Sequence, residues 1–177
     1  MDEQLQRYID EGVPTDLTSW SNDQLRRVRA EDEAVEAAVS YARRVLQGRV
    51  DIVRAELERR HAAGSERAAT LLDGLAALLA GDHVATDPAR ARATSVEVPA
   101  RAEDLVARID ADLGESVLSR LADRDDAAIA SLLDALGDHE VELSQARRAL
   151  FDRIDAMRDE LAARYKDGRA SVADLLR

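Results

Sequence analysis

The chain has 177 residues and a formal net charge of −11, and only 3% of its residues are aromatic. Few aromatic residues, together with 8 glycines and 3 prolines, argue against a β-sandwich or a β-barrel. The absence of cysteine excludes disulfides, thiolate metal sites and cysteine nucleophiles, and the negative charge disfavours direct DNA binding.

Residues 1–20 are expected to form an N-terminal arm. In this arm Leu5, Tyr8 and Ile9 share one face of a short amphipathic helix. Gly12 is a typical residue at which such a helix ends.

A long helix is expected within residues 21–64, from about residue 22 to residue 63. Ser21 can cap its first turn, and Gln24 stands at the capping-box position three residues later. The segment contains no proline, and Gly64 is a typical stop at its end.

Residues 65–124 are expected to form a linker and a helical insertion. The run ERAATLLDGLAALLAG predicts a helix that ends at Gly81. The residues from there to about position 100 carry two prolines and predict a loop. The spacing of apolar residues then predicts another helix from Ala102 to about Asp123.

A second long helix is expected within residues 125–168, followed by a short tail at 169–177. It runs by pattern from about Asp125 to Tyr165 and ends before Gly168. The sequence therefore predicts an all-α fold. Its architecture is an antiparallel two-helix coiled coil with a short N-terminal helix and a helical insertion between the long helices.

The two long helices repeat each other at an offset of 104 residues. The offset pairs Glu36 with Glu140, Ser40 with Ser144, Arg43 with Arg147, Arg44 with Arg148, and Asp51 with Asp155. Composition alone would seldom produce this agreement in spacing.

The repeat includes polar residues at positions where a coiled coil is normally apolar. One column of heptad positions is apolar in both helices: Val39, Leu46 and Val53, and Leu136, Leu143, Leu150 and Met157. The other column contains Glu36 and Arg43 in the first helix, and Glu140 and Arg147 in the second. Antiparallel helices would bring Glu36 to Arg147 and Glu140 to Arg43.

Two interpretations of these polar positions stay open. Buried Glu–Arg layers can fix the register of a coiled coil, which would make the chain a structural adaptor. Alternatively, the polar stripe formed by positions 36, 40, 43, 47 and 51, about 80° wide and about 22 Å long, is a ligand site. Arginine forks and carboxylates suit a ligand with anionic oxygens and flat heterocycles, and arginine recognises the O6 and N7 edge of guanine.

The stripe reads E-x3-S-x2-R-x3-Q-x3-D in the first helix. It resembles the signature of the RsiG-type anti-sigma factors of actinobacteria, which bind cyclic di-GMP. The second copy keeps the Glu, Ser, Arg and Asp of the pattern and has Phe151 in place of Gln. Phe151 can stack on a base or pack against the hairpin, and we favour packing.

The resemblance implies a developmental regulator of sporulation. Cyclic di-GMP would bind as two molecules on the paired motifs, and the loaded protein would hold a WhiG-type sigma factor away from RNA polymerase. It implies binding by Glu36, Ser40, Arg43, Gln47, Asp51, Glu140, Ser144, Arg147 and Asp155, with additional contacts from Arg44, Arg148 and Phe151. With both motifs in one chain, it also implies a monomer.

Other functional classes find little support in the sequence. The three histidines are scattered without metal-ligand spacing, and neither a Gly-rich phosphate loop nor a nucleophile motif is present. We therefore expect no metal and no enzymatic activity. No apolar run approaches the roughly 18 residues of a membrane span, and the acidic N-terminus is unlike a signal peptide, so we expect a cytoplasmic protein.

Overall fold

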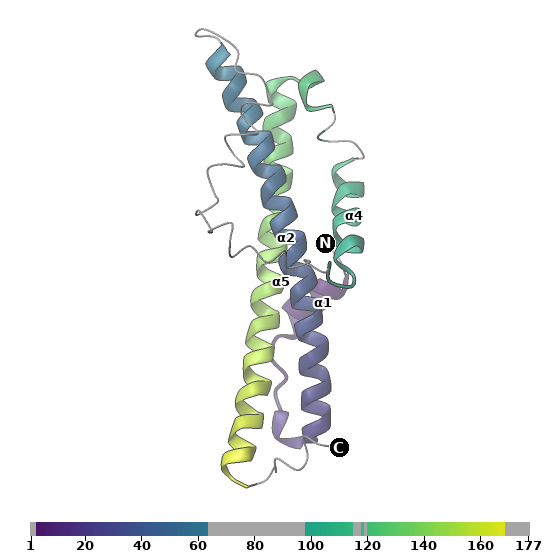
Figure 1. Ribbon diagram of the computed structural model, residues 1–177, viewed down its shortest axis with the longest axis vertical. Coiled ribbons are helices and arrows are strands. Elements are labelled where there is room, and N and C mark those ends of the chain that lie inside the picture. Colours follow the sequence, from purple (N-terminus) through teal and green to yellow (C-terminus); the bar gives the residue numbers. More distant parts are fainter. Residues whose placement is uncertain (1–2, 64–97, 115–117, 119, 169–177) are drawn as a thin grey trace, which may run out of the picture.

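The computed structural model describes residues 3–63, 98–114, 118 and 120–168. This part of the chain is helical and contains no strand. Two long helices, α2 (Asn22–Ala63) and α5 (Asp126–Lys166), lie side by side along the whole length of the molecule (Figure 1). They run in opposite directions, so the predicted all-α antiparallel hairpin is confirmed.

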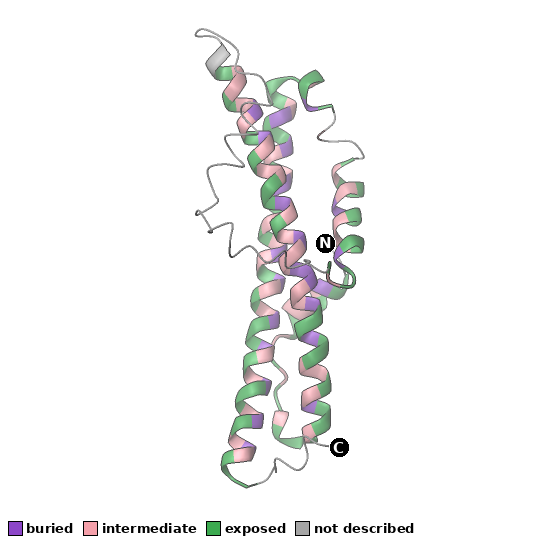
Figure 2. Cartoon of the chain, viewed as in Figure 1, coloured by how far each residue is buried: buried purple, intermediate pink, exposed green. Residues whose placement is uncertain are grey.

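The buried seam between α2 and α5 is the apolar column that the heptad pattern predicts. The buried residues of this column are Val39, Leu46, Val53, Leu136, Leu143, Leu150 and Met157. Burial follows a narrow stripe on the facing sides of the two helices, and their outer sides are exposed (Figure 2). The hydrophobic effect therefore acts along one line of contact, as in a coiled coil.

The long helices begin where the sequence predicts. The backbone N–H of Gln24 donates to Ser21 Oγ at 3.1 Å, which confirms Ser21 as the N-cap of α2. The N–H of Ala128 donates to the Asp125 carboxylate at 2.7 Å in the same way at the start of α5. Each side chain satisfies a backbone donor that has no partner within its helix.

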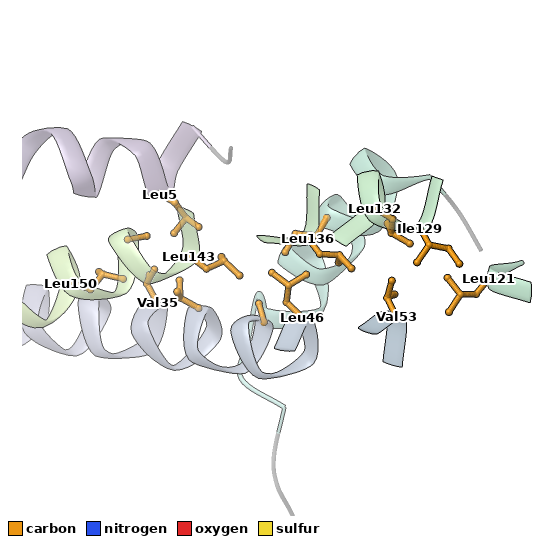
Figure 3. Packing of buried hydrophobic residues seen from close by; sticks show 14 residues of the cluster. Leu5, Val35, Leu46, Val53, Leu121, Ile129, Leu132, Leu136, Leu143 and Leu150 are labelled. Atoms are coloured by element: carbon orange, nitrogen blue, oxygen red, sulfur yellow. The ribbon is translucent and has the colours of Figure 1, made fainter. Parts of the chain in front are cut away.

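Two short helices cover one side of the hairpin. They are α1 (Glu3–Glu11) and α4 (Ala102–Leu113), and their buried residues Leu5 and Ile109 join the core of the hairpin. Figure 3 shows Leu5 close to Leu143 of α5. The amphipathic helix predicted in the arm is thus present.

The helix predicted from Ala102 to about Asp123 is wrong in its second part. It ends at Leu113, because Gly114 has φ 89° and ψ 133°, a backbone conformation outside the helical region that glycine adopts readily. Residues Leu121–Asp123 form a separate 3-10 turn, η2, directly before α5. The periodicity of apolar residues continued across this break, so the pattern did not reveal it.

The internal repeat extends beyond the long helices. A 3-10 turn, η1 (Leu17–Ser19), precedes α2 as η2 precedes α5, at the same offset of 104 residues. Near the end of each long helix, an arginine contacts the 3-10 turn that precedes the other long helix. Arg164 donates to the carbonyls of Leu17, Thr18 and Trp20 and to the side chain of Asn22. Arg60 donates to the carbonyls of Leu121, Ala122 and Arg124 and to the side chain of Asp126.

We call these two sets of contacts the Arg60 clasp and the Arg164 clasp. Every acceptor in one clasp lies 104 residues from its counterpart in the other. Each short helix likewise packs mainly on the long helix of the other copy, α1 on α5 and α4 on α2. The described chain is therefore two copies of one unit, a short helix, a 3-10 turn and a long helix, related by a pseudo-twofold axis across the hairpin.

Three predicted segments lie outside the described residues. They are the helix that ends at Gly81, most of the loop up to residue 100, and the tail at 169–177. Among the described helices, none combines the length and the apolar character of a membrane-spanning segment.

Candidate functional site

Two crossed ion pairs join α2 and α5 at the middle of the hairpin. Arg147 Nε lies 3.1 Å from Glu36 Oε1, and Arg43 Nη1 lies 3.3 Å from Glu140 Oε1. The sequence predicted both pairs for antiparallel helices, and both are confirmed. The pseudo-twofold axis exchanges one pair for the other.

The half around Arg43 is a set of hydrogen bonds that converge on one carboxylate. Glu140 Oε1 accepts from Arg43, from Gln47 Nε2 at 3.4 Å and from Ser144 Oγ at 3.3 Å. All three bonds are long. Arg43 Nε is buried without a hydrogen-bond partner among the described residues, so this guanidinium retains donor capacity.

The half around Arg147 is held more tightly and by different chemistry. Arg147 Nε donates to Ser40 Oγ at 2.9 Å as well as to Glu36, and Ser40 Oγ donates to Glu36 at 2.5 Å. The guanidinium carbon of Arg147 lies 4.7 Å from the centroid of the Phe151 ring, which is a cation–π distance. Phe151 therefore takes the place that Gln47 has in the other half.

Phe151 does not pack into the core. The residue is 37% exposed, and it contributes to neither of the hydrophobic clusters formed by the described residues. Position 151 lies beside the seam, on the polar stripe, and the choice between packing against the hairpin, which the sequence favours, and stacking on a base stays a prediction.

The remaining predicted site residues lie at the margin of the stripe. Asp51 pairs with Arg54, and Asp155 pairs with Arg158, each within its own helix and with both partners more than half exposed. Within the described part of the chain, Arg44 and Arg148 have no partner and are exposed. The structure thus brings seven of the predicted residues together at the centre, Glu36, Ser40, Arg43, Gln47, Glu140, Ser144 and Arg147, with Phe151 against Arg147.

The polar stripe opens on the side of the hairpin that α1 and α4 leave uncovered. Val35 and Ala38 line a recess together with Leu5 of α1 and Leu105 of α4. Ser40 follows Ala38 by two residues, a rotation of about 200° around the helix axis. The short helices and the stripe therefore lie on different sides, and a ligand can approach the stripe without displacing α1 or α4.

A buried ion pair beyond the stripe was not predicted from the sequence. Arg153 Nε lies 2.9 Å from Asp32 Oδ2, and Arg153 also donates to the carbonyl of Gly12 at 2.8 Å. Burial raises the pKa of the Asp32 carboxyl, and the Arg153 guanidinium opposes part of that effect. This pair fixes the end of α1 to both long helices. Arg153 repeats Arg49 at the 104-residue offset, but the counterpart of Asp32 is Leu136, so the repeat does not predict this pair.

No group of three or more histidine and carboxylate side chains in the described residues is arranged to hold a metal ion. The centre offers two guanidinium groups, two carboxylates, two hydroxyls, one amide and one aromatic ring.

Comparison with known proteins identifies one family. The sequence model of the RsiG-like family matches residues 11–79 and 115–177, which include both long helices and the whole stripe. A search of the curated proteins finds no match.

Proposed function

The chain belongs to the RsiG-like family, which indicates an anti-sigma factor with a sigma factor as its partner, and we propose that it is controlled by cyclic di-GMP. In this proposal two nucleotide molecules bind the paired motifs of a single chain. The loaded protein then holds a WhiG-type sigma factor away from RNA polymerase, and a fall in nucleotide releases it. The chain acts by binding, in the cytoplasm, and catalyses no reaction.

The observation that carries this proposal is the pair of crossed Arg–Glu contacts, open on the uncovered side of the hairpin. Arg43 and Glu140 are 26% and 33% exposed, so neither side chain is committed to a dry core. Arginine offers a planar fork of donors that fits phosphate oxygens and the O6 and N7 edge of guanine. Glutamate can accept from the N–H groups on the opposite edge of the same base.

Register fixing is the weaker explanation of the same contacts. The Asp32–Arg153 pair and the two clasps already fix how α2 and α5 align, and Asp32, Arg153 and Arg164 are buried. The Arg43–Glu140 contact, at 3.3 Å, is longer than the Asp32–Arg153 contact, at 2.9 Å, and both of its partners are more exposed. A polar layer that is not needed for alignment and remains open to solvent is better explained by a ligand.

Electrostatics supports an anionic ligand at this position. The protein as a whole is strongly acidic, with a net charge of −11, so a doubly charged nucleotide needs local cations to bind. Arg43 and Arg147 supply them. A bound nucleotide would present anionic oxygens and flat rings on the outer face of the hairpin, where a basic sigma-factor surface can dock.

Calorimetric titration of cyclic di-GMP tests the proposal. We expect the wild-type chain to bind about two nucleotides, either alone or once the WhiG-type sigma factor is present. Arg43→Ala and Arg147→Ala should each abolish measurable binding. Arg27→Ala is the matched control, since Arg27 is exposed on the same helix and lies about 180° around the helix axis from Glu36.

The unfolding free energies of the same variants separate the two explanations. A partly exposed pair contributes about 1 kcal/mol or less, so Arg43→Ala should leave the fold nearly as stable as the wild type. A layer that fixes register would cost about 3–5 kcal/mol on losing one partner. Wild-type protein that binds no nucleotide in either condition would leave the structural adaptor as the better account.

A further inference from the structure

We propose that the two halves of the site hold the nucleotide differently, and that Phe151 is a stacking residue for one of its bases. This inference rests on the proposed function and concerns how the same site recognises its ligand. It follows from the one place where the two motifs differ.

The half of the site around Gln47 can recognise a ligand through hydrogen bonds. The Gln47 amide offers both a donor and an acceptor, its side chain is exposed, and it reaches only a long contact of 3.4 Å with Glu140. Arg43 beside it is partly exposed and makes only a long contact of 3.3 Å with the same carboxylate. Polar groups on this half can therefore form hydrogen bonds with the edge of a base.

The Phe151 half cannot do the same. A phenyl ring neither donates nor accepts a conventional hydrogen bond, and Arg147 beside it already donates to Glu36 and Ser40. What this half offers is a flat surface, the exposed ring of Phe151 with the guanidinium of Arg147 over it at 4.7 Å. Nucleobases stack on such aromatic and guanidinium surfaces.

A purely structural role does not account for the position of this ring. Phe151 is the single phenylalanine of the chain. It lies outside the hydrophobic clusters of the described residues, on a stripe whose other members are polar. The part of the ring that remains exposed contributes little to folding, whereas a flat ligand that covers it gains the apolar area and the stacking contact.

The consequence is that the ligand lies asymmetrically across the pseudo-twofold axis. One base is recognised at its edge by the Gln47 half, and another lies flat against Phe151. The two halves then differ in the chemistry that they select, although the ion pairs beneath them are equivalent.

Nuclear magnetic resonance on protein labelled only at phenylalanine tests this directly, because the single ring gives one unambiguous set of signals. Titration with cyclic di-GMP, with the sigma factor present if binding requires it, should move the ring signals upfield through the ring current of the base. It should also produce cross-peaks between the ring protons and guanine H8.

Three variants separate stacking from apolar contact. Phe151→Leu keeps an apolar side chain of similar size without a π face and should weaken binding by about 5- to 150-fold, as Phe151→Ala should. Phe151→Tyr should bind as the wild type does. Because the ring is partly exposed and outside the core, all three should fold, which circular dichroism checks.

Failure of this inference differs from failure of the proposed function. If the wild type binds cyclic di-GMP while the ring signals stay unmoved, or Phe151→Leu binds with wild-type affinity, stacking is wrong and the proposed function stands. If the wild type binds no nucleotide with or without the sigma factor, the proposed function fails and this inference fails with it.

Discussion

The two copies of the repeated unit make the same contacts at the ends of the hairpin but differ at its centre. At the ends, the Arg60 and Arg164 clasps repeat contact for contact, down to the side chain of Asp126 or Asn22 that completes each one. At the centre, the ion pairs repeat, but the side chain beside each arginine changes from the amide of Gln47 to the ring of Phe151.

The difference distinguishes contacts that the fold needs from contacts that face outward. A clasp binds backbone carbonyls, which are present whatever the sequence, so its geometry can be kept in both copies as long as the arginine remains. The side chains at 47 and 151 are exposed and satisfy no buried group, so either copy can change there without cost to folding. Divergence at this position is therefore free to serve recognition.

The largest expected effect comes from breaking one clasp at a time. Arg164→Ala removes a buried guanidinium that holds three carbonyls of the N-terminal arm and should lower the unfolding free energy by about 3–5 kcal/mol. Arg60 is more exposed, so Arg60→Ala should cost only about 1.5–3 kcal/mol. Equilibrium unfolding in urea measures both, and equal losses would show that burial does not distinguish the clasps.

Acid should weaken the Arg60 end through Glu56. This side chain is fully buried, and hydrogen bonds from Arg59 and then Arg60 lower the pKa of its carboxyl from 4.5 to about 2. A pKa that is lower in the folded state gives stability that is complete above pH 4.5 and is lost as the pH falls toward 2.

Glu56→Gln is the variant that isolates this contribution. The difference in unfolding free energy between wild type and variant should be largest above pH 4.5 and should shrink steadily down to pH 2. Urea unfolding at a series of pH values gives the difference, and a gap that stays constant over this range would contradict the assignment.

A smaller effect is expected from the two glycines that end the short helices. Gly114 has φ 89° and ψ 133°, a combination that is nearly restricted to glycine, so Gly114→Ala should cost about 1–3 kcal/mol. Gly12 has φ 56°, which a side chain adopts at a cost of about 1 kcal/mol. Neither added methyl group would meet an atom, so thermal unfolding of the two variants compares backbone strain alone.

The smallest effect is expected at the two N-caps. Ser21→Ala and Asp125→Ala should each cost about 1 kcal/mol, because each removes an acceptor from the first turn of a long helix. Asp125 also places a negative charge at the positive end of α5. The loss of unfolding free energy in Asp125→Ala should therefore be larger at low salt and should approach the loss in Ser21→Ala at high salt. An identical salt response of the two variants would contradict this charge contribution.

The sequence alone predicted the parts of the molecule that have a periodic signal. The seam from Val39 to Val53, the cap at Ser21 and the crossed pairs of Arg43 and Arg147 all follow from heptad position and antiparallel direction. The same offset relates Glu56 and Arg60 to Glu160 and Arg164, but it did not predict what these arginines bind.

Contacts without periodicity were missed. The acceptors of Arg60 and Arg164 are backbone carbonyls, which leave no mark on the side-chain pattern. The break at Gly114 depends on one backbone angle, and the exposure of Phe151 depends on where its position falls beside the seam. Both are set by tertiary structure, which a helical pattern does not specify.

Joining both copies of the unit in one chain has a consequence for how the site responds to its surroundings. When two motifs meet by association of separate chains, the amount of complete site depends on protein concentration. Here the covalent connection makes the pairing of Arg43 with Glu140 an intramolecular event, whose effective concentration is independent of how many copies of the protein a cell holds. The fraction of assembled sites is therefore the same in a dilute and in a concentrated pool of the protein, and under the proposed function only the ligand and the partner set its occupancy.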